Sequence, residues 1–63
     1  MSKKRTVEID GLNKKETFKA VLYSDEEDIE IWLPKSQMRE WPEPGQAGTF
    51  EMTEWIATEK ELV

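Results

Sequence analysis

The chain of 63 residues contains no cysteine and no histidine. Without cysteine there is no disulfide, which excludes the disulfide-stabilised scaffold of small secreted proteins. The usual structural zinc sites are excluded as well, because they need cysteine or histidine at set spacings. Histidine is also the commonest general acid or base near neutral pH. We therefore expect a cytoplasmic protein without a metal or a cofactor.

Catalytic motifs are also missing. The sequence has no glycine-rich phosphate loop and no nucleophile elbow. A chain this short buries only about 60% of its unfolded surface, which leaves little room for a deep substrate pocket. Long apolar runs are absent too: the longest, Ala20 to Tyr23, is far shorter than the roughly 20 residues of a membrane-spanning helix. We expect a non-enzymatic protein with a flat binding surface and no membrane segment.

The charge is unevenly distributed around a net value of −5. Residues 1–21 carry six cations and three acids, whereas residues 22–63 carry three cations and eleven acids. We expect one domain over residues 1–63, with residues 1–5 as a flexible basic arm. The acidic balance disfavours generic nucleic-acid binding, since neutralisation of phosphates supplies most of that affinity.

The most informative segment present is 25–36. The acidic turn, Asp25–Asp28, leads into alternating apolar and polar residues over 29–33, and Pro34 then ends the run. Alternation with a period of two, closed by proline, is typical of a half-buried β-strand. Similar patterns predict strands over 6–10, 17–23 and 49–52, with Phe50 and Met52 facing inward. Residues 24–28 are the expected turn before the third strand.

Turn residues and caps predict the remaining connections. Asp10-Gly11 indicates a hairpin, since glycine adopts positive φ without penalty. The loop Leu12–Lys15 is too long for a two-residue turn, so a bulged or longer hairpin is expected. Residues 35–38 suit a single helical turn, and Pro44-Gly45 suits the centre of a type II turn. Thr53 is the expected N-cap of a short C-terminal helix. We therefore predict a mainly β fold: a small curved antiparallel sheet, or an SH3/OB-like barrel, of four or five strands with one C-terminal helix.

The three tryptophans receive separate interpretations. Trp55 lies next to Ile56 on the expected helix and is predicted to be a core residue. Trp32 has two open interpretations, either covered by the helix or exposed. Trp41 either packs on the proline-rich loop or anchors a partner, since an aromatic residue beside an arginine is a common interface anchor.

Two kinds of binding surface follow from these residues. For a protein partner, the candidates are Trp41, Arg39, Lys35, Trp32, Asp25, Glu26, Glu27 and Asp28. The acidic turn is either a solvated turn or a steering surface that imitates phosphate charge; it lacks the ligand spacing of an EF-hand. For nucleic acid, the alternative, the candidates are Lys3, Lys4, Arg5, Lys14, Lys15 and Lys19, with Lys35, Arg39, Phe18, Tyr23, Trp32 and Trp41 in support. That alternative requires the basic residues to converge on one face.

Two segments carry a family resemblance: Ile29-Glu30-Ile31-Trp32-Leu33-Pro34-Lys35-Ser36-Gln37, and the ending from Thr53-Glu54-Trp55-Ile56-Ala57 to Leu62. Together they resemble a group of short uncharacterised proteins of bacteriophages and mobile elements. The resemblance implies a small accessory protein that binds and blocks a host protein, for example as an inhibitor of host defence. A purely structural or assembly subunit is a third hypothesis.

Overall fold

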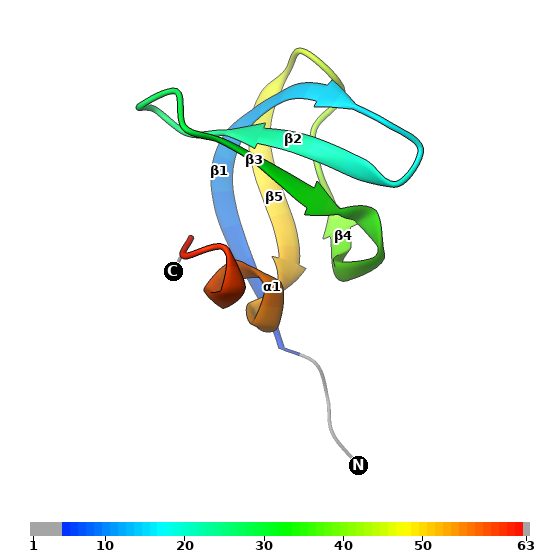
Figure 1. The fold of residues 1–63 in the computed structure, drawn as a ribbon, viewed down its shortest axis with the longest axis vertical. Coiled ribbons are helices and arrows are strands. Elements are labelled where there is room, and N and C mark those ends of the chain that lie inside the picture. The colour runs from blue at the N-terminus through cyan, green and yellow to red at the C-terminus, as the bar shows by residue number, and fades with distance from the viewer. Residues whose placement is uncertain (1–4, 63) are drawn as a thin grey trace.

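Strand β1 (Thr6–Glu16) is the centre of the fold, because it pairs with a different strand along each half. The computed structural model describes residues 5–62. Its other elements are β2 (Ala20–Ser24), β3 (Glu30–Pro34), the 3-10 helix η1 (Lys35–Gln37), β4 (Met38–Glu40), β5 (Ala47–Thr53) and α1 (Glu54–Glu59). The first half of β1 pairs with β5 and the second half with β2, both antiparallel (Figure 1).

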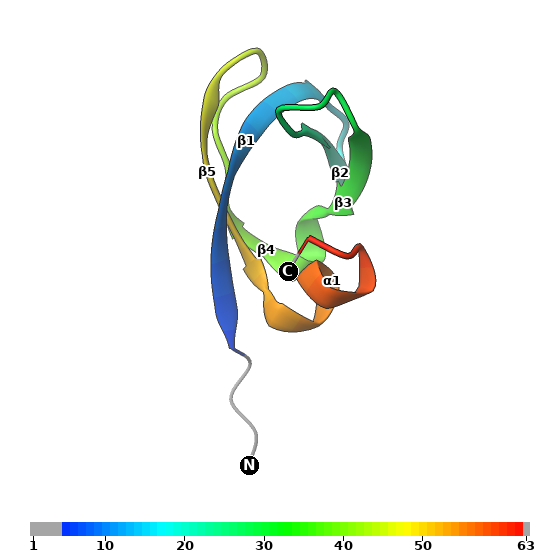
Figure 2. The same cartoon turned by 90° about the vertical axis from the view of Figure 1, so that its left-hand side faces the viewer.

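The five strands form one curved sheet in the order β3-β2-β1-β5-β4. Figure 2 shows β1 and β5 on one side of the arc, β2 and β3 on the other, and β4, η1 and α1 across the lower end. The outer strands, β3 and β4, do not pair with each other within residues 5–62. The prediction of a mainly β, curved antiparallel sheet with a C-terminal helix is confirmed. The sheet is not closed into a barrel.

The Asp10-Gly11 hairpin prediction is wrong, because β1 continues through Gly11 to Glu16. Gly11 is needed there for another reason. A Cβ atom at this position would lie 2.2 Å from Cε2 of Tyr23, so only glycine lets the ring pass over the strand. The tyrosine hydroxyl then donates to the carbonyl of Asp10 (3.1 Å).

The first hairpin turn falls instead at residues 17–19. The N–H of Thr17 bonds the carbonyl of Ala20 (2.8 Å), and the N–H of Ala20 bonds the Thr17 hydroxyl (3.1 Å). The predicted strand over 17–23 therefore begins only at Ala20. Phe18 lies in this turn with 91% of its surface exposed, rather than on a strand face.

The core lies inside the curve of the sheet. Phe50, Met52, Val21 and Leu33 have no exposed surface, so the inward placement of Phe50 and Met52 is confirmed. The Tyr23 ring meets Phe50 edge to face at a centroid distance of 5.0 Å, a favoured aromatic geometry.

Helix α1 closes the lower end of this core with Ile56 and Ala57. The Thr53 hydroxyl accepts from the N–H of Ile56 (3.2 Å), which confirms the N-cap. Trp55 faces away and is 61% exposed, so its prediction as a core residue is wrong. At six residues the helix offers only one short buried face.

The two remaining connections follow the expected turn chemistry. Residues 35–37 form η1, within the predicted helical turn. Gly45 has a φ of +86°, and the N–H of Gln46 donates to the carbonyl of Glu43 (2.9 Å), which confirms the type II turn at Pro44-Gly45. Strand β4, only three residues long, has no counterpart among the predicted strands.

Candidate functional site

The outer face of β1, β2 and β3 carries an exposed tryptophan and a half-buried leucine beside lysines. The strand register places Lys15 opposite Leu22, and Leu22 opposite Trp32, which is 44% exposed. Residues directly opposite in neighbouring strands share a face of the sheet. We call this set, together with Phe18 and Lys19 in the adjoining turn, the aromatic face: Lys15, Phe18, Lys19, Leu22 and Trp32.

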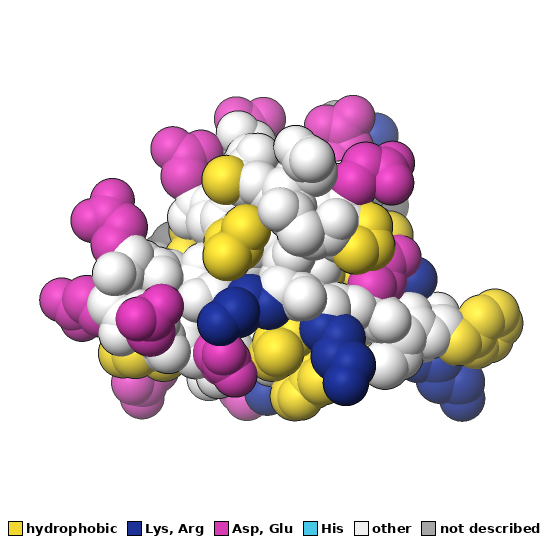
Figure 3. Space-filling view, turned by 90° about the horizontal axis from the view of Figure 1, so that it is seen from above, with side chains coloured by type: hydrophobic (Ala, Val, Ile, Leu, Met, Phe, Trp, Pro, Cys, Tyr) yellow, Lys and Arg dark blue, Asp and Glu magenta, His cyan; other side chains and the backbone are white. Residues whose placement is uncertain are grey.

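A bulge in β1 adds Lys14 to the edge of the aromatic face. The register between β1 and β2 shifts between Asn13 and Lys15. Lys14 reaches across β2 to Glu30 with an Nζ–Oε2 distance of 3.0 Å. Its charge is therefore already paired, whereas Lys15 and Lys19 are exposed. Figure 3 shows hydrophobic side chains lying between Lys and Arg side chains along the lower part of the view.

A second cluster joins β1 to η1 and to the loop after β4. Lys35 pairs with Glu16 at 2.7 Å, and its Nζ lies 5.6 Å from the centre of the Trp41 ring. These contacts hold the lysine between the Glu16 carboxylate and the Trp41 ring. Trp41 itself is partly buried against the core. Both predicted anchors, Lys35 and Trp41, are therefore engaged within the domain.

Asn13 is the buried centre of this cluster. Its Nδ2 donates to Oε1 of Glu16 (3.1 Å) and to the carbonyl of Pro42 (2.7 Å). Its backbone bonds the following turn as well: its N–H donates to Gln46, and its carbonyl accepts from Gly45. Lys35 and Asn13, in that order, lower the pKa of Glu16 by bonding its ionised form. We call these residues the loop joint: Asn13, Glu16, Lys35, Trp41 and Pro42.

The acidic turn lies at the other end of β2 and β3. Oδ1 of Asp25 accepts from the N–H groups of Glu27 (2.8 Å) and Ile29 (3.0 Å). Asp28 has a φ of +62°, a conformation that aspartate tolerates better than most residues. Glu26, Glu27 and Asp28 are exposed. Figure 3 shows acidic side chains gathered at this left-hand end of the molecule.

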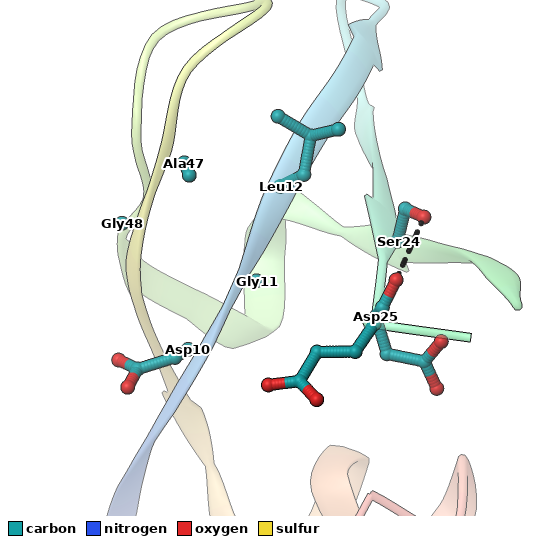
Figure 4. A pocket seen from close by; sticks show the side chains of 8 residues that line it. Asp10, Gly11, Leu12, Ser24, Asp25, Ala47 and Gly48 are labelled. Atoms are coloured by element: carbon teal, nitrogen blue, oxygen red, sulfur yellow. Dashed lines mark hydrogen bonds between the residues drawn. The ribbon is translucent and has the colours of Figure 1, made fainter. Parts of the chain in front are cut away.

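A shallow pocket of about 480 Å3 lies beside the acidic turn. Figure 4 shows Asp10, Leu12, Ala47 and Asp25 around it, with the Ser24 hydroxyl bonded to the Asp25 carbonyl (3.4 Å). Desolvation, followed by the charge of Asp25, raises the pKa of nearby Tyr23. No three acidic side chains in the described part of the chain converge on a position that could hold a metal ion. The pocket offers an acidic rim without an evident nucleophile or acid–base pair.

The predicted partner-binding residues thus fall in three places. Lys35 and Trp41 belong to the loop joint, Trp32 to the aromatic face, and Asp25, Glu26, Glu27 and Asp28 to the acidic turn. Arg39 is exposed on β4, where it lines a smaller pocket of about 370 Å3 with Trp41 and Pro42.

The nucleic-acid candidates converge only in part. Lys14, Lys15 and Lys19 lie on or beside the aromatic face. Lys3 and Lys4 lie outside the described residues. Arg5 is exposed, but its carbonyl accepts from the N–H of Glu54 (2.7 Å), so its backbone belongs to the domain.

Sequence reasoning missed two residues that matter here. Phe18 was placed on a strand because apolar residues alternate through 17–23; the signal for a turn was Thr17, whose hydroxyl bonds Ala20. Asn13 had no sequence signal, because its bonds to Pro42 and Gln46 span about half the chain.

Comparison with known proteins adds no further constraint. No protein-family model, curated protein or solved structure matches the chain. The resemblance to phage and mobile-element proteins stays a prediction. None of the helical segments within residues 5–62 has the length and apolar character required to cross a membrane.

Proposed function

We propose that the protein is a non-enzymatic interaction module that docks on a protein partner through its aromatic face. The observation that supports this most is the exposure of Phe18 and Trp32, at 91% and 44%, beside Lys15 and Lys19. Aromatic residues are enriched in the buried centres of protein interfaces, where they supply much of the binding energy. Trp32 and Phe18 therefore replace Trp41 as the leading anchors.

The other candidate residues take supporting roles in this proposal. Arg39 is exposed on β4 and can contact the same partner, whereas Lys35 and Trp41 stabilise the segments before and after that strand. The acidic turn lies at the far end of β2 and β3 and suits electrostatic steering, which raises association rates more than affinity. Following the resemblance, we propose a phage or mobile-element protein that binds, and thereby inhibits, a host protein in the cytoplasm.

The test is affinity capture from host lysate with a matched set of variants. The double variant F18S/W32A removes both anchors. The control Trp55→Ala removes a tryptophan that is even more exposed than Trp32, but from α1. We expect one protein to be enriched by the wild type and by the control, and lost with the double variant at unchanged thermal stability. Equal enrichment by all three proteins would refute docking through the aromatic face.

Nucleic-acid binding is the second candidate, favoured by the position of Lys14, Lys15 and Lys19 next to Phe18 and Trp32. Aromatic rings can stack on bases while lysines bind phosphates. Titration of labelled single- and double-stranded oligonucleotides at two salt concentrations tests it, because phosphate contacts weaken steeply with salt. Oligonucleotide binding at low salt that is lost in each of the single variants Lys15→Gln and Trp32→Ala would favour this candidate over a protein partner.

A further inference from the structure

The free edge of β3 presents backbone groups whose direction can be derived from the flanking hydrogen bonds. The N–H of Asp25 bonds the carbonyl of Ile29 (3.2 Å), and the N–H of Lys35 bonds the carbonyl of Lys19 (2.8 Å). In an antiparallel pair, bonding to the neighbour alternates residue by residue. Ile31 and Leu33 therefore bond β2, whereas Glu30, Trp32 and Pro34 direct their backbone groups away from it.

Glu30 and Trp32 thus offer two N–H donors and two carbonyl acceptors at the outer edge. No turn or loop hydrogen bond within residues 5–62 involves their backbone groups. Pro34 has no N–H, so it ends the bonding edge at the side of η1. The start of β3, at Glu30, is the end of the strand that lies farther from α1 in Figure 1. This open stretch is short, and a partner strand could form about four backbone bonds there.

The side chains along this edge have a pattern with a period of two. Glu30 and Trp32 lie on the outer face, whereas Ile31 packs toward the core. Ile29 shares the parity of Ile31 and is 50% exposed, just beyond the end of the strand. Oε2 of Glu30 pairs with Lys14 (3.0 Å), which leaves Oε1 for a second cation. A neighbouring strand that fits both faces would therefore place cationic residues beside Glu30 and Trp32, and apolar residues beside Ile29 and Ile31.

The geometry points to strand addition at the β3 edge by an extended partner segment in which basic and apolar residues alternate. The inference rests on the proposed function and specifies the kind of partner segment. The acidic turn precedes the edge directly, so its exposed carboxylates attract the same basic segment. A second copy of this chain fits the edge less well, because two copies each carry a net charge of −5.

Amide hydrogen exchange of the free protein tests the edge itself. We expect the amides of Ile31 and Leu33 to exchange slowly and those of Glu30 and Trp32 to exchange fast, because only the first two bond β2. Slow exchange at Glu30 and Trp32, together with the mass of a dimer, would overturn the inference, since a second copy would then occupy the edge.

Peptide titration tests the occupant. The probe is a capped heptapeptide, Lys-Val-Lys-Val-Lys-Val-Lys, and its counterpart has glutamate in place of lysine. We expect the lysine peptide to bind at least about tenfold more tightly and to slow exchange at Glu30 and Trp32. The expected pairing is antiparallel, in which two opposite residues share a face and exchange both backbone bonds. The lysines opposite Glu30 and Trp32 would therefore form the bonds through their N–H groups. N-methylation of the lysines should abolish binding, whereas N-methylation of the valines should not.

Protein variants separate the backbone from the side chains. Glu30→Pro removes an outward N–H without removing a bond to β2, and Glu30→Gln keeps the N–H while removing the charge. We expect Glu30→Pro to abolish peptide binding and Glu30→Gln to weaken it severalfold. Glu8→Gln, an exposed glutamate on the other half of the sheet, should leave it unchanged.

Two results would overturn strand addition. One is an absence of peptide binding at about 1 mM. The other is binding that leaves exchange at Glu30 and Trp32 fast and tolerates N-methylated lysines; this would mean that the peptide contacts side chains only. The proposed function is decided separately, by capture with the Phe18 and Trp32 variants.

Discussion

The loop joint and the acidic turn both hold a connection between strands in place through polar side chains, but their hydrogen bonds differ in range and burial. In the acidic turn, one carboxylate oxygen of Asp25 accepts from the N–H groups two and four residues ahead. In the loop joint, the amide of Asn13 bonds the Pro42 carbonyl, 29 residues away, from a fully buried position. The first arrangement is local and exposed, whereas the second is long-range and centred on a buried side chain.

This difference teaches where the stability of the molecule depends on polar groups. A buried donor or acceptor that loses its partner retains the full cost of desolvation, whereas an exposed group recovers bonds to water. Oδ1 of Asn13 already lies buried without a partner within the described chain. The loop joint is therefore sensitive to small changes, and the acidic turn is tolerant of them.

The largest expected effect follows from removal of the amide at the loop joint. We expect Asn13→Ala to lower the free energy of unfolding by about 2 kcal/mol, because the Pro42 carbonyl loses its buried donor. That loss corresponds to roughly 10 °C in melting temperature for a domain of this size. Urea and thermal unfolding followed by circular dichroism measure both quantities.

Asn13→Asp serves as the matched control for shape. It keeps the size of the side chain but replaces the Nδ2 donor by an oxygen that faces the Glu16 carboxylate and the Pro42 carbonyl. We expect it to be at least as destabilising as alanine. Stability equal to that of the wild type would mean that the amide bonds do not hold the joint.

A smaller loss is expected at the acidic turn. Asp25→Ala removes the acceptor of two N–H groups, but water can replace it, so we expect a loss of about 1 kcal/mol. Asp25→Asn retains an acceptor oxygen and should retain most of the stability. A loss from Asp25→Ala as large as that from Asn13→Ala would remove the contrast between the two regions.

The same contrast explains what could be predicted from the sequence. Features set by neighbouring residues were predicted correctly: the strand before Pro34, the type II turn at Gly45 and the Thr53 cap. Gly11 was misread because its role depends on Tyr23, which approaches from another strand. Trp55 was misread because the buried face of a six-residue helix is selected by the sheet beneath it. The partner-binding residues stay predictions, since side-chain exposure supports a surface but does not identify what binds it.

A substitution that relieves backbone strain in the acidic turn should stabilise the protein, in contrast to the losses predicted above. Asp28 adopts a left-handed φ of +62°, where a Cβ atom costs energy and glycine does not. We expect Asp28→Gly to raise the free energy of unfolding by about 0.5 kcal/mol. Asp28→Val, with a branched Cβ, should lower it. Chemical denaturation measures both variants. If glycine and valine change the free energy of unfolding in the same direction, the left-handed φ of Asp28 is not a source of strain.

The smallest effect is a dependence on pH that belongs to the loop joint. Lys35 and Asn13 lower the pKa of Glu16, so at acidic pH the folded state binds fewer protons at this group than the unfolded state. The resulting stability is complete above the ordinary glutamate value of about 4.3. This stability is lost as the pH falls from that value through the lowered pKa of Glu16 in the folded state.

Glu16→Gln should therefore flatten the profile of unfolding free energy against pH below about 4.3, whereas Glu8→Gln, on the same strand, serves as the control for removal of one carboxylate. An unchanged slope between pH 4.3 and pH 2 in Glu16→Gln, measured by urea unfolding at each pH, would show that the ion pair with Lys35 does not couple proton binding to folding.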